Sequence, residues 1–293
     1  MKRILIISDG KPGHLNQSIA FCKIKNISYD IVEVKFKSKI HKLLSYVFDK
    51  IDFYTDALYE DYRKYYYDFY DAVVSAGSST YYLNKLLSKE NSIKSIALMY
   101  PKGYKTNSFD YIIAQEHDEF KSQENIITVP LNLSYLKSKN IIKQDEDKKS
   151  LAIIIGGNNK VFNMETSKIR ESIESILEQY PEYLKYITTS SRTPLEVEDL
   201  IHEYEFDYKL IFSREPNINP LGDFVHNCDK FFITIDSTSM ISEIRANSDA
   251  SVEIIDLQSR KENTKYHRLV ENVKKIDKKV DFEKLLGKVK IWE

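Results

Sequence analysis

The chain has 293 residues, of which 43 are lysine or arginine and 44 are aspartate or glutamate. The formal net charge of −1 excludes the basic excess of a dedicated nucleic-acid binder, so any recognition of phosphate must be local. Charged residues make up 30% and hydrophobic residues 42%, which indicates a soluble globular protein. No apolar run approaches the roughly 20 residues of a membrane-spanning helix, and at roughly 150 residues per domain the length favours two domains.

The N-terminal apolar run, residues 4–7, is too short for the core of a signal peptide and predicts a first β-strand. The two cysteines, Cys22 and Cys228, are isolated and form no CxxC pair. This pattern argues against a disulfide scaffold or a thiolate zinc site and fits a reducing compartment. We therefore expect the protein in the cytoplasm.

Apolar runs alternate with amphipathic segments through the first half of the chain, which predicts βαβ units and a mostly parallel sheet. A charged, non-periodic stretch at 143–150 then predicts a linker. Before it, strands are expected at residues 3–8, 29–36, 71–76, 95–99, 111–114 and 126–129, with helices from about 14, over 40–51 and from about 80.

The same alternation restarts after the linker, with expected strands at 151–155, 186–189, 208–212, 231–235 and 252–255 and helices at 164–179, 194–204, from 238 and twice near the C-terminus. The fold class predicted is therefore α/β, with two Rossmann-like domains at 1–145 and 146–293 whose sheets face a central cleft. The last helix is placed either in the second domain or packed back on the first. In such a chain, ligands bind at the carboxyl ends of the strands.

The loop after the first strand, residues 8–18, carries the densest group of polar side chains. Its two glycines allow a tight turn with backbone N–H groups exposed at a helix N-terminus. An imidazole there can act as a base or a hydrogen-bond donor. The alternative is a turn whose histidine only caps the helix. The candidate residues are Asp9, Gly10, Gly13, His14, Asn16 and Gln17.

Two further strand ends in the first half carry weaker signals. Gly77 and Ser78 follow the strand at 71–76, where a hydroxyl can bind a ligand or simply cap the next helix. Glu116 and His117 follow the strand at 111–114, where a carboxylate beside an imidazole suits proton transfer or a solvated turn. A metal site is not expected, because adjacent residues of an extended segment point in opposite directions.

Three strand ends in the second half suit an anionic ligand. Gly156 and Gly157 let the backbone approach a ligand closely, with Asn158 beside them and Lys160 as a nearby charge; the alternative is a tight turn. Ser190, Ser191 and Arg192 precede a helix that begins at Pro194, where a guanidinium suits bidentate phosphate recognition or only flanks a capped helix.

The third of these strand ends combines hydroxyls with a helix N-terminus, which favours an anion. Its residues are Asp236, Ser237, Thr238, Ser239 and Met240, and Asp236 and Ser237 are alternatively a capping pair. Glu243 falls one to two turns into the helix, where it would accept a hydrogen bond from a ribose hydroxyl beside a bound diphosphate.

Seven ordered blocks cover nearly the whole chain and together resemble one family, the bacterial glycosyltransferase-like proteins grouped with the plant elongated-mitochondria fission proteins. The sequence departs from the pattern of that family at Asn158-Asn159, and at Ser78-Ser79, where basic residues are common. The matching blocks are SDGKPGHLNQS at 8–18, AGSST at 76–80, FDYIIAQEHD at 109–118, IIIGGNNK at 153–160, TTSSRTP at 188–194, NPLGDF at 219–224 and ITIDSTSMISE at 233–243.

This family looks like the two-domain GT-B class, so the resemblance implies that the second half binds a nucleotide-sugar donor and the first half an acceptor. It places Gly13 and His14 at the sugar-transfer cleft. It implies a bacterial enzyme of surface-polysaccharide biosynthesis whose acceptor is a cell-surface glycan or a lipid-linked molecule. The donor residues that it implies are Gly156, Gly157, Ser190, Ser191, Arg192, Ser237, Thr238, Ser239 and Glu243.

The expected reaction is a sugar transfer that needs neither a metal nor a bound cofactor, since no DxD signature appears. Asp9 and His14 rank first as the base that deprotonates the acceptor, and Glu116 ranks next. Two alternatives remain open. A non-catalytic scaffold would share the fold, as in the plant relatives, and so would a sugar-nucleotide epimerase, which needs no acceptor.

One predicted helix, residues 40–51, bears a continuous apolar stripe surrounded by lysines. It is either an ordinary helix that faces the core or a helix that lies on the anionic cytoplasmic face of the inner membrane. The stripe contains Ile40, Leu43, Leu44, Val47, Phe48 and Ile51, and the lysines are Lys35, Lys37, Lys39, Lys42 and Lys50.

Overall fold

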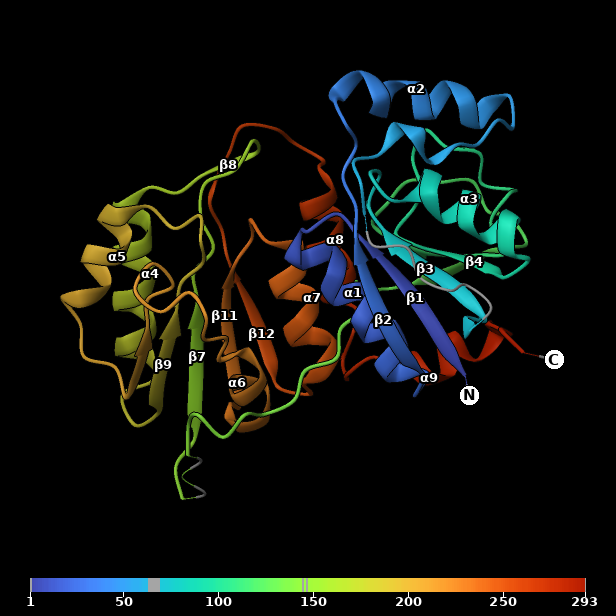
Figure 1. Cartoon of the computed structure of the whole chain (residues 1–293). Helices are drawn as coiled ribbons and strands as arrows, with labels where there is room; N and C mark the ends of the chain where they lie inside the picture. Colours follow the sequence, from blue (N-terminus) through green and yellow to red (C-terminus); the bar gives the residue numbers. More distant parts are fainter. Residues whose placement is uncertain (1, 63–68, 144, 146, 293) are drawn as a thin grey trace. The chain divides into compact units, whose positions relative to one another are not determined.

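The computed structural model describes residues 2–62, 69–143, 145 and 147–292, and the chain forms two compact units. Unit 1 consists of Met1–Tyr135 together with Asp281–Glu293, and unit 2 of Leu136–Val280. Each unit has its own parallel sheet and its own hydrophobic core (Figure 1). The prediction of an α/β fold with Rossmann-like halves is confirmed.

Unit 1 contains a six-stranded parallel sheet in the order β2-β1-β3-β4-β5-β6. The strand order reverses between β1 and β3, so the loops that follow these two strands flank a topological switch point. The strands are β1 (Arg3–Ser8), β2 (Ser28–Glu33), β3 (Ala72–Ala76), β4 (Lys94–Leu98), β5 (Tyr111–Gln115) and β6 (Ile126–Val129). The helices are α1 (Pro12–Ile24), α2 (Lys39–Lys50), α3 (Tyr81–Asn91) and α9 (Phe282–Leu285), with 3-10 turns η1 (Asp56–Leu58) and η3 (Leu286–Lys288).

Unit 2 contains a five-stranded parallel sheet in the order β10-β9-β7-β11-β12 and a small antiparallel pair, β8 with β13. Its switch point lies between β7 and β11. The strands are β7 (Ser150–Ile154), β8 (Phe162–Asn163), β9 (Leu184–Thr188), β10 (Tyr208–Leu210), β11 (Lys230–Thr234), β12 (Ser251–Ile255) and β13 (Gln258–Ser259). The helices are α4 (Thr166–Gln179), α5 (Leu195–His202), α6 (Leu221–Asn227), α7 (Thr238–Asn247) and α8 (Lys265–Val273).

The division between the units lies at Tyr135 and Leu136 rather than at the predicted 145/146. The intervening segment packs with unit 2 because the Asp223 carboxylate of α6 accepts backbone N–H groups from Lys139, Asn140 and Ile141, at 2.6, 3.0 and 2.8 Å. Residues 144 and 146 of the predicted linker lie outside the described residues. At the other end, the 281–293 segment belongs to unit 1.

Of the six residues in the apolar stripe that the sequence indicated along α2, four are exposed. Leu44 and Phe48 pack against the core of unit 1, so the core-facing interpretation holds for them. The other four apolar residues, Ile40, Leu43, Val47 and Ile51, are exposed. Among the described residues, no helix combines the length and the apolar character that crossing a membrane requires.

The two cysteines are buried in different units, Cys22 in α1 and Cys228 at the end of α6. Removal from water disfavours the thiolate, and burial raises the pKa of each thiol to about 12.

A buried ion pair ties α2 to α3. Lys85 of α3 and Asp49 of α2 have no exposed side-chain surface, and their Nζ and Oδ1 atoms lie 2.7 Å apart. Lys85 also donates to the Lys105 carbonyl at 2.6 Å, and Asp49 accepts the Lys105 N–H at 2.7 Å and the Tyr54 hydroxyl at 3.0 Å. The pair therefore fixes α2 against the loop after β4.

We predict that Asp49→Asn lowers the free energy of unfolding of unit 1 by about 3–5 kcal/mol, because it leaves the Lys85 charge buried without its partner. The fluorescence of Trp292, the one tryptophan of the chain, reports the urea unfolding of this unit. The control is Glu60→Gln, which breaks an exposed 3.2 Å pair with Lys35 in the same unit and should cost at most about 1 kcal/mol. Equal losses in the two variants would contradict the prediction.

Candidate functional site

The loop after β1 forms a carboxylate–imidazole pair in unit 1. His14 Nδ1 lies 3.0 and 3.1 Å from the two oxygens of Asp9, and Lys11 Nζ lies 2.9 Å from one of them. Although burial raises the pKa of Asp9, the hydrogen bonds from His14 and Lys11 outweigh it and lower that pKa to about 2. A charged Asp9 only accepts, so the ring hydrogen lies on Nδ1, and Nε2 of a neutral ring is free to take a proton.

The loop after β3 closes over this pair. A Cβ added at Gly77, whose φ is +91°, would lie 2.3 Å from His14 Nδ1, so only glycine permits this approach. The next residues, Ser78 and Ser79, accept hydrogen bonds from Lys42 Nζ of α2 at 2.8 and 3.2 Å. Lys42 therefore brings a positive charge to a loop that lacks one of its own.

The remaining predicted residues of unit 1 surround the pair without joining it. Gln17 is buried in α1 and its Oε1 accepts the amide of Gln115 at the end of β5, at 3.3 Å. Among the described residues, no hydrogen bond or ion pair links the Glu116 side chain to Asp9 or His14. As for exposure, Glu116, Gly10 and Asn16 are exposed, Gly13 is half-buried and His117 is buried.

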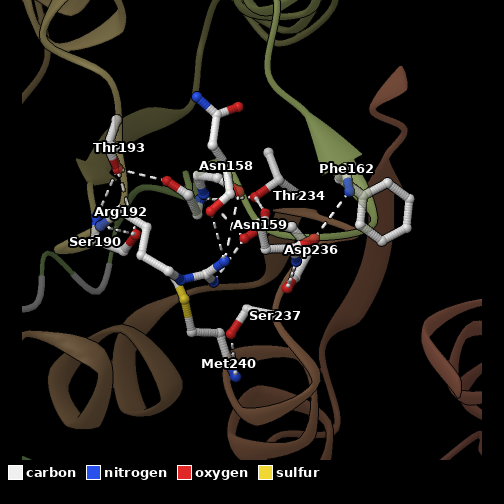
Figure 2. Close-up of polar contacts among 12 residues, drawn as sticks. Asn158, Asn159, Phe162, Ser190, Arg192, Thr193, Thr234, Asp236, Ser237 and Met240 are labelled. Atoms are coloured by element: carbon white, nitrogen blue, oxygen red, sulfur yellow. Dashed lines mark hydrogen bonds and ion pairs between the residues drawn. The ribbon is translucent and has the colours of Figure 1, made fainter. Parts of the chain in front are cut away.

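In unit 2, the loops at the switch point converge on the buried carboxylate of Asp236 (Figure 2). Its Oδ1 accepts the Thr234 hydroxyl at 2.7 Å, and its Oδ2 accepts the Gly157 N–H at 2.9 Å and Arg192 Nη2 at 2.7 Å. The Asp236 side chain has no exposed surface, whereas that of Arg192 is 37% exposed. Asp236 is thus buried, and it orients the arginine.

Two glycines make this convergence possible. A Cβ at Gly156 would lie 2.1 Å from an oxygen of Asp236, and a Cβ at Gly157 would lie 1.9 Å from the Arg192 carbonyl oxygen. The Gly156 N–H donates to the Thr234 hydroxyl at 2.7 Å. The glycines therefore serve the close packing of three loops, each at the end of a strand.

The arginine is held beside a helix N-terminus. Asp236 directly precedes Ser237, the N-cap of α7, whose hydroxyl accepts the Met240 N–H at 3.3 Å. Thr238 and Ser239 form the first turn of the helix and are half-buried. The positive end of the helix dipole and a partly exposed guanidinium together make this corner favourable for an anion such as a diphosphate.

Two of the predicted donor residues, Asn158 and Ser190, make side-chain hydrogen bonds within the loops. Asn158 Oδ1 accepts the Met164 N–H, and Asn159 Oδ1 accepts the N–H groups of Val161 and Phe162, all within 2.8 Å. Ser190 Oγ accepts the Arg192 N–H at 3.2 Å. The side chains of Lys160 and Ser191 are exposed.

Glu243 lies in α7, six residues beyond its N-cap, and burial raises the pKa of its carboxyl group to about 7. A carboxyl group with this pKa changes its charge near neutral pH. Its charged form is favoured by a hydrogen-bond donor, such as a hydroxyl group.

Three residues of these sites were not among those predicted from the sequence, namely Lys42, Thr193 and Thr234. Thr193 accepts the Ser190 N–H at 2.9 Å and donates to the Gly156 carbonyl. Thr193 and Thr234 lie within the matching blocks at 188–194 and 233–243, whereas Lys42 comes from helix α2. No group of three or more His, Cys, Asp or Glu side chains suited to a metal ion occurs in the described part of the chain.

Comparison with known families gives one match that covers most of the chain. A family model described as Mitochondrial fission ELM1 matches residues 12–293. No curated protein sequence matches this chain significantly.

Comparison with solved structures finds the same two-domain, GT-B-like fold. The S. aureus MnaA–UDP co-structure has a TM-score of 0.52 at 14% identity, over 99% of this chain and 88% of that chain. A UDP-GlcNAc 2-epimerase from Neisseria meningitidis bound to UDP-GlcNAc has a TM-score of 0.50 at 14% identity, over 92% and 85%. A Listeria monocytogenes protein described as a UDP-N-acetylglucosamine 2-epimerase has a TM-score of 0.54 at 10% identity, over 92% and 82%.

We predict that Gly156→Ala destabilises unit 2 by at least about 2 kcal/mol, because the new methyl group overlaps the buried Asp236 carboxylate. Urea unfolding followed by circular dichroism measures the loss. The matched control is Gly287→Ala, where a Cβ meets nothing within 4 Å and the change should be neutral or slightly stabilising. A Gly156→Ala protein as stable as the wild type would show that the loop can move away from Asp236.

Proposed function

This chain belongs to the mitochondrial fission ELM1 family, and from the sites of its two units we propose that it is a glycosyltransferase that uses a nucleotide-sugar donor. The observation that carries the proposal is the corner of unit 2 where Asp236 holds Arg192 beside the N-terminus of α7. That corner offers a fixed positive charge and backbone N–H groups to a diphosphate. The donor bound by this unit is then a nucleoside diphosphate sugar, with Glu243 accepting a ribose hydroxyl.

The fold neighbours support this class of ligand, because two of them are described with UDP or UDP-GlcNAc bound. The proposed acceptor is a cell-surface glycan or a lipid-linked molecule with a free hydroxyl, bound by unit 1. This part of the proposal rests on the family resemblance. The enzyme is proposed to work at the cytoplasmic face of the membrane in surface-polysaccharide biosynthesis.

The proposed chemistry needs no metal ion. His14 Nε2 takes the proton of the acceptor hydroxyl, and Asp9 stabilises the imidazolium that forms. The acceptor oxygen forms a bond to the anomeric carbon while the bond from that carbon to the diphosphate oxygen breaks. The nucleoside diphosphate leaves with the electron pair, and Arg192 and the α7 N-terminus stabilise its charge.

A sugar-nucleotide epimerase is the second candidate, because the neighbours with a TM-score of 0.50 or more include proteins described as UDP-GlcNAc 2-epimerases. Product analysis separates the two functions. An epimerase converts the nucleotide sugar without an acceptor, whereas a transferase releases the nucleotide and glycosylates the acceptor.

The first experiment is a thermal-stability screen with UDP, GDP, CMP, CDP and ADP and their common sugar conjugates. A ligand that binds only the folded protein stabilises it by about 2.7 kcal/mol at 100 times its Kd, which is a clear shift of the midpoint. No shift with any compound would favour a non-catalytic scaffold.

We predict that mutations in the two sites affect different properties, nucleotide affinity for Arg192 and turnover for His14. Arg192→Lys keeps a charge for Asp236 but loses the planar fork, so the Kd of the nucleotide should rise about tenfold or more. His14→Ala should leave that Kd within about twofold and lower kcat by about 10²–10⁴-fold. Calorimetry measures the affinity and a nucleotide-release assay the turnover. Full turnover in His14→Ala would exclude it as the base.

We also predict a pH-dependent donor affinity. A ribose hydroxyl donates a hydrogen bond to the ionised form of Glu243. Because the pKa of Glu243 is about 7, about a tenth of the protein carries the ionised carboxylate at pH 6 and about nine-tenths at pH 8. The affinity for a nucleotide sugar, whose diphosphate does not titrate in this range, should therefore rise about tenfold from pH 6 to pH 8. Glu243→Gln should bind with nearly constant affinity. The same pH dependence in both proteins would assign it to another group.

A further inference from the structure

Helix α2 presents an apolar face to solvent. Three exposed apolar side chains of the helix and that of its C-cap, Ile51, follow one another at spacings of three or four residues, so they lie on one side of it. Phe53, just beyond the helix, extends this surface. The exposed fractions are 69% for Ile40, 64% for Leu43, 51% for Val47, 67% for Ile51 and 51% for Phe53.

This concentration is unusual for the described part of the chain. Of the nine large hydrophobic side chains that the described residues expose, these five lie within one stretch of 14 residues. Scattered apolar side chains are normal on a protein surface, but a contiguous group marks a surface that another body covers. We call residues 40–53 the α2 face.

The α2 face is rimmed by positive charge. Lys37, Lys39 and Lys50 are exposed around it. The two aspartates of the segment are already paired elsewhere, Asp49 with Lys85 and Asp52 with Lys105. In a chain whose net charge is −1, this surface is therefore a local excess of positive charge without acidic partners inside the segment.

We propose that the α2 face docks on an anionic lipid bilayer, with its apolar side chains among the headgroups and its lysines against lipid phosphates. Both parts of the surface match this occupant, because interfacial helices combine an apolar face with a basic rim. A second copy of the chain fits less well. Two-fold contact between identical α2 faces would place the same lysines against each other.

The α2 face is tied to the site of unit 1. Lys42 of the same helix donates to the hydroxyls of Ser78 and Ser79, and the preceding Gly77 lies against the ring of His14. The side chain of Lys42 thus connects the helix that would lie on the bilayer to the loop at 77–79, which contacts the proposed base His14. If the proposed function holds, the acceptor is a molecule that the bilayer carries, and the docked helix presents it to His14.

Flotation of the full chain with lipid vesicles tests the docking. Vesicles of phosphatidylcholine with phosphatidylglycerol should carry the protein, and pure phosphatidylcholine should carry much less. Leu43→Glu should lower the partition coefficient at least about tenfold. The matched control is Leu195→Glu in α5, a leucine that is 69% exposed in unit 2 and should leave flotation unchanged. Unfolding midpoints in urea verify that both variants fold.

A charge series provides an independent measurement. Lys39→Gln combined with Lys50→Gln should weaken binding and reduce its dependence on salt, because fewer lysines then meet lipid phosphates. Lys168→Gln, at an exposed position of α4, is the control and should change neither.

Failure of the proposal has distinct signs. Absence of flotation with anionic vesicles overturns it, and so does equal binding to neutral vesicles. Concentration-dependent dimerisation that Leu43→Glu abolishes, without flotation, assigns the α2 face to a second copy instead.

Nucleotide affinity separates this proposal from the proposed function. Leu43→Glu should bind nucleotide like the wild type, and flotation that persists in a chain without nucleotide affinity would leave the docking standing while the enzyme proposal fails.

Discussion

The buried carboxylate of Asp236 is the interaction on which the site of unit 2 depends. Removing a carboxylate from water costs several kcal/mol unless donors and an opposing charge compensate it. Here the donors come from three places, Thr234 at the end of β11, Gly157 after β7 and Arg192 after β9. One charge therefore fixes three loops at once, and the glycine turn, the arginine and the start of α7 all take their positions from it.

Unit 1 uses the same principle with a different partner. Asp9 is almost fully covered, and its charge is compensated by His14 and Lys11 in the loop after the first strand. The difference between the units lies in what the carboxylate holds. An arginine stays charged at any physiological pH and suits the binding of a permanent anion, whereas an imidazole can gain and lose a proton. The two carboxylates thus support side chains of different chemistry, a guanidinium in unit 2 and an imidazole in unit 1.

Much of the fold could be predicted from the sequence because both sheets are parallel and buried. Their strands are short apolar runs, such as β7 and β11, separated by helices with clear periodicity. Helix α6 was not predicted, because it has only seven residues, one of them Gly222. The boundary between the units, at Tyr135 and Leu136, was not predicted. It depends on a single residue, Asp223, which accepts hydrogen bonds from three consecutive N–H groups far from it in the sequence. Such a contact leaves no periodic signal.

The candidate sites were predictable to the level of the loop but not of the side chain. Glycines and hydroxyls after strands indicated where a ligand could approach, because strand ends meet at one edge of a parallel sheet. Which side chains are turned inward depends on packing. Asp236 is buried and holds Arg192, whereas Asn158 accepts the Met164 N–H from an exposed position. Lys42 could not be found, because its contact with Ser78 joins α2 to a distant loop.

Because both cysteines are buried, their reactivity reports the opening of each unit. Each unit holds one thiol, and burial that raises the pKa to about 12 leaves almost no thiolate to react at neutral pH. A thiol reagent therefore modifies Cys22 only when unit 1 opens and Cys228 only when unit 2 opens. The rates of alkylation at the two positions, read by mass spectrometry of peptides, give the opening of each unit separately within one intact chain.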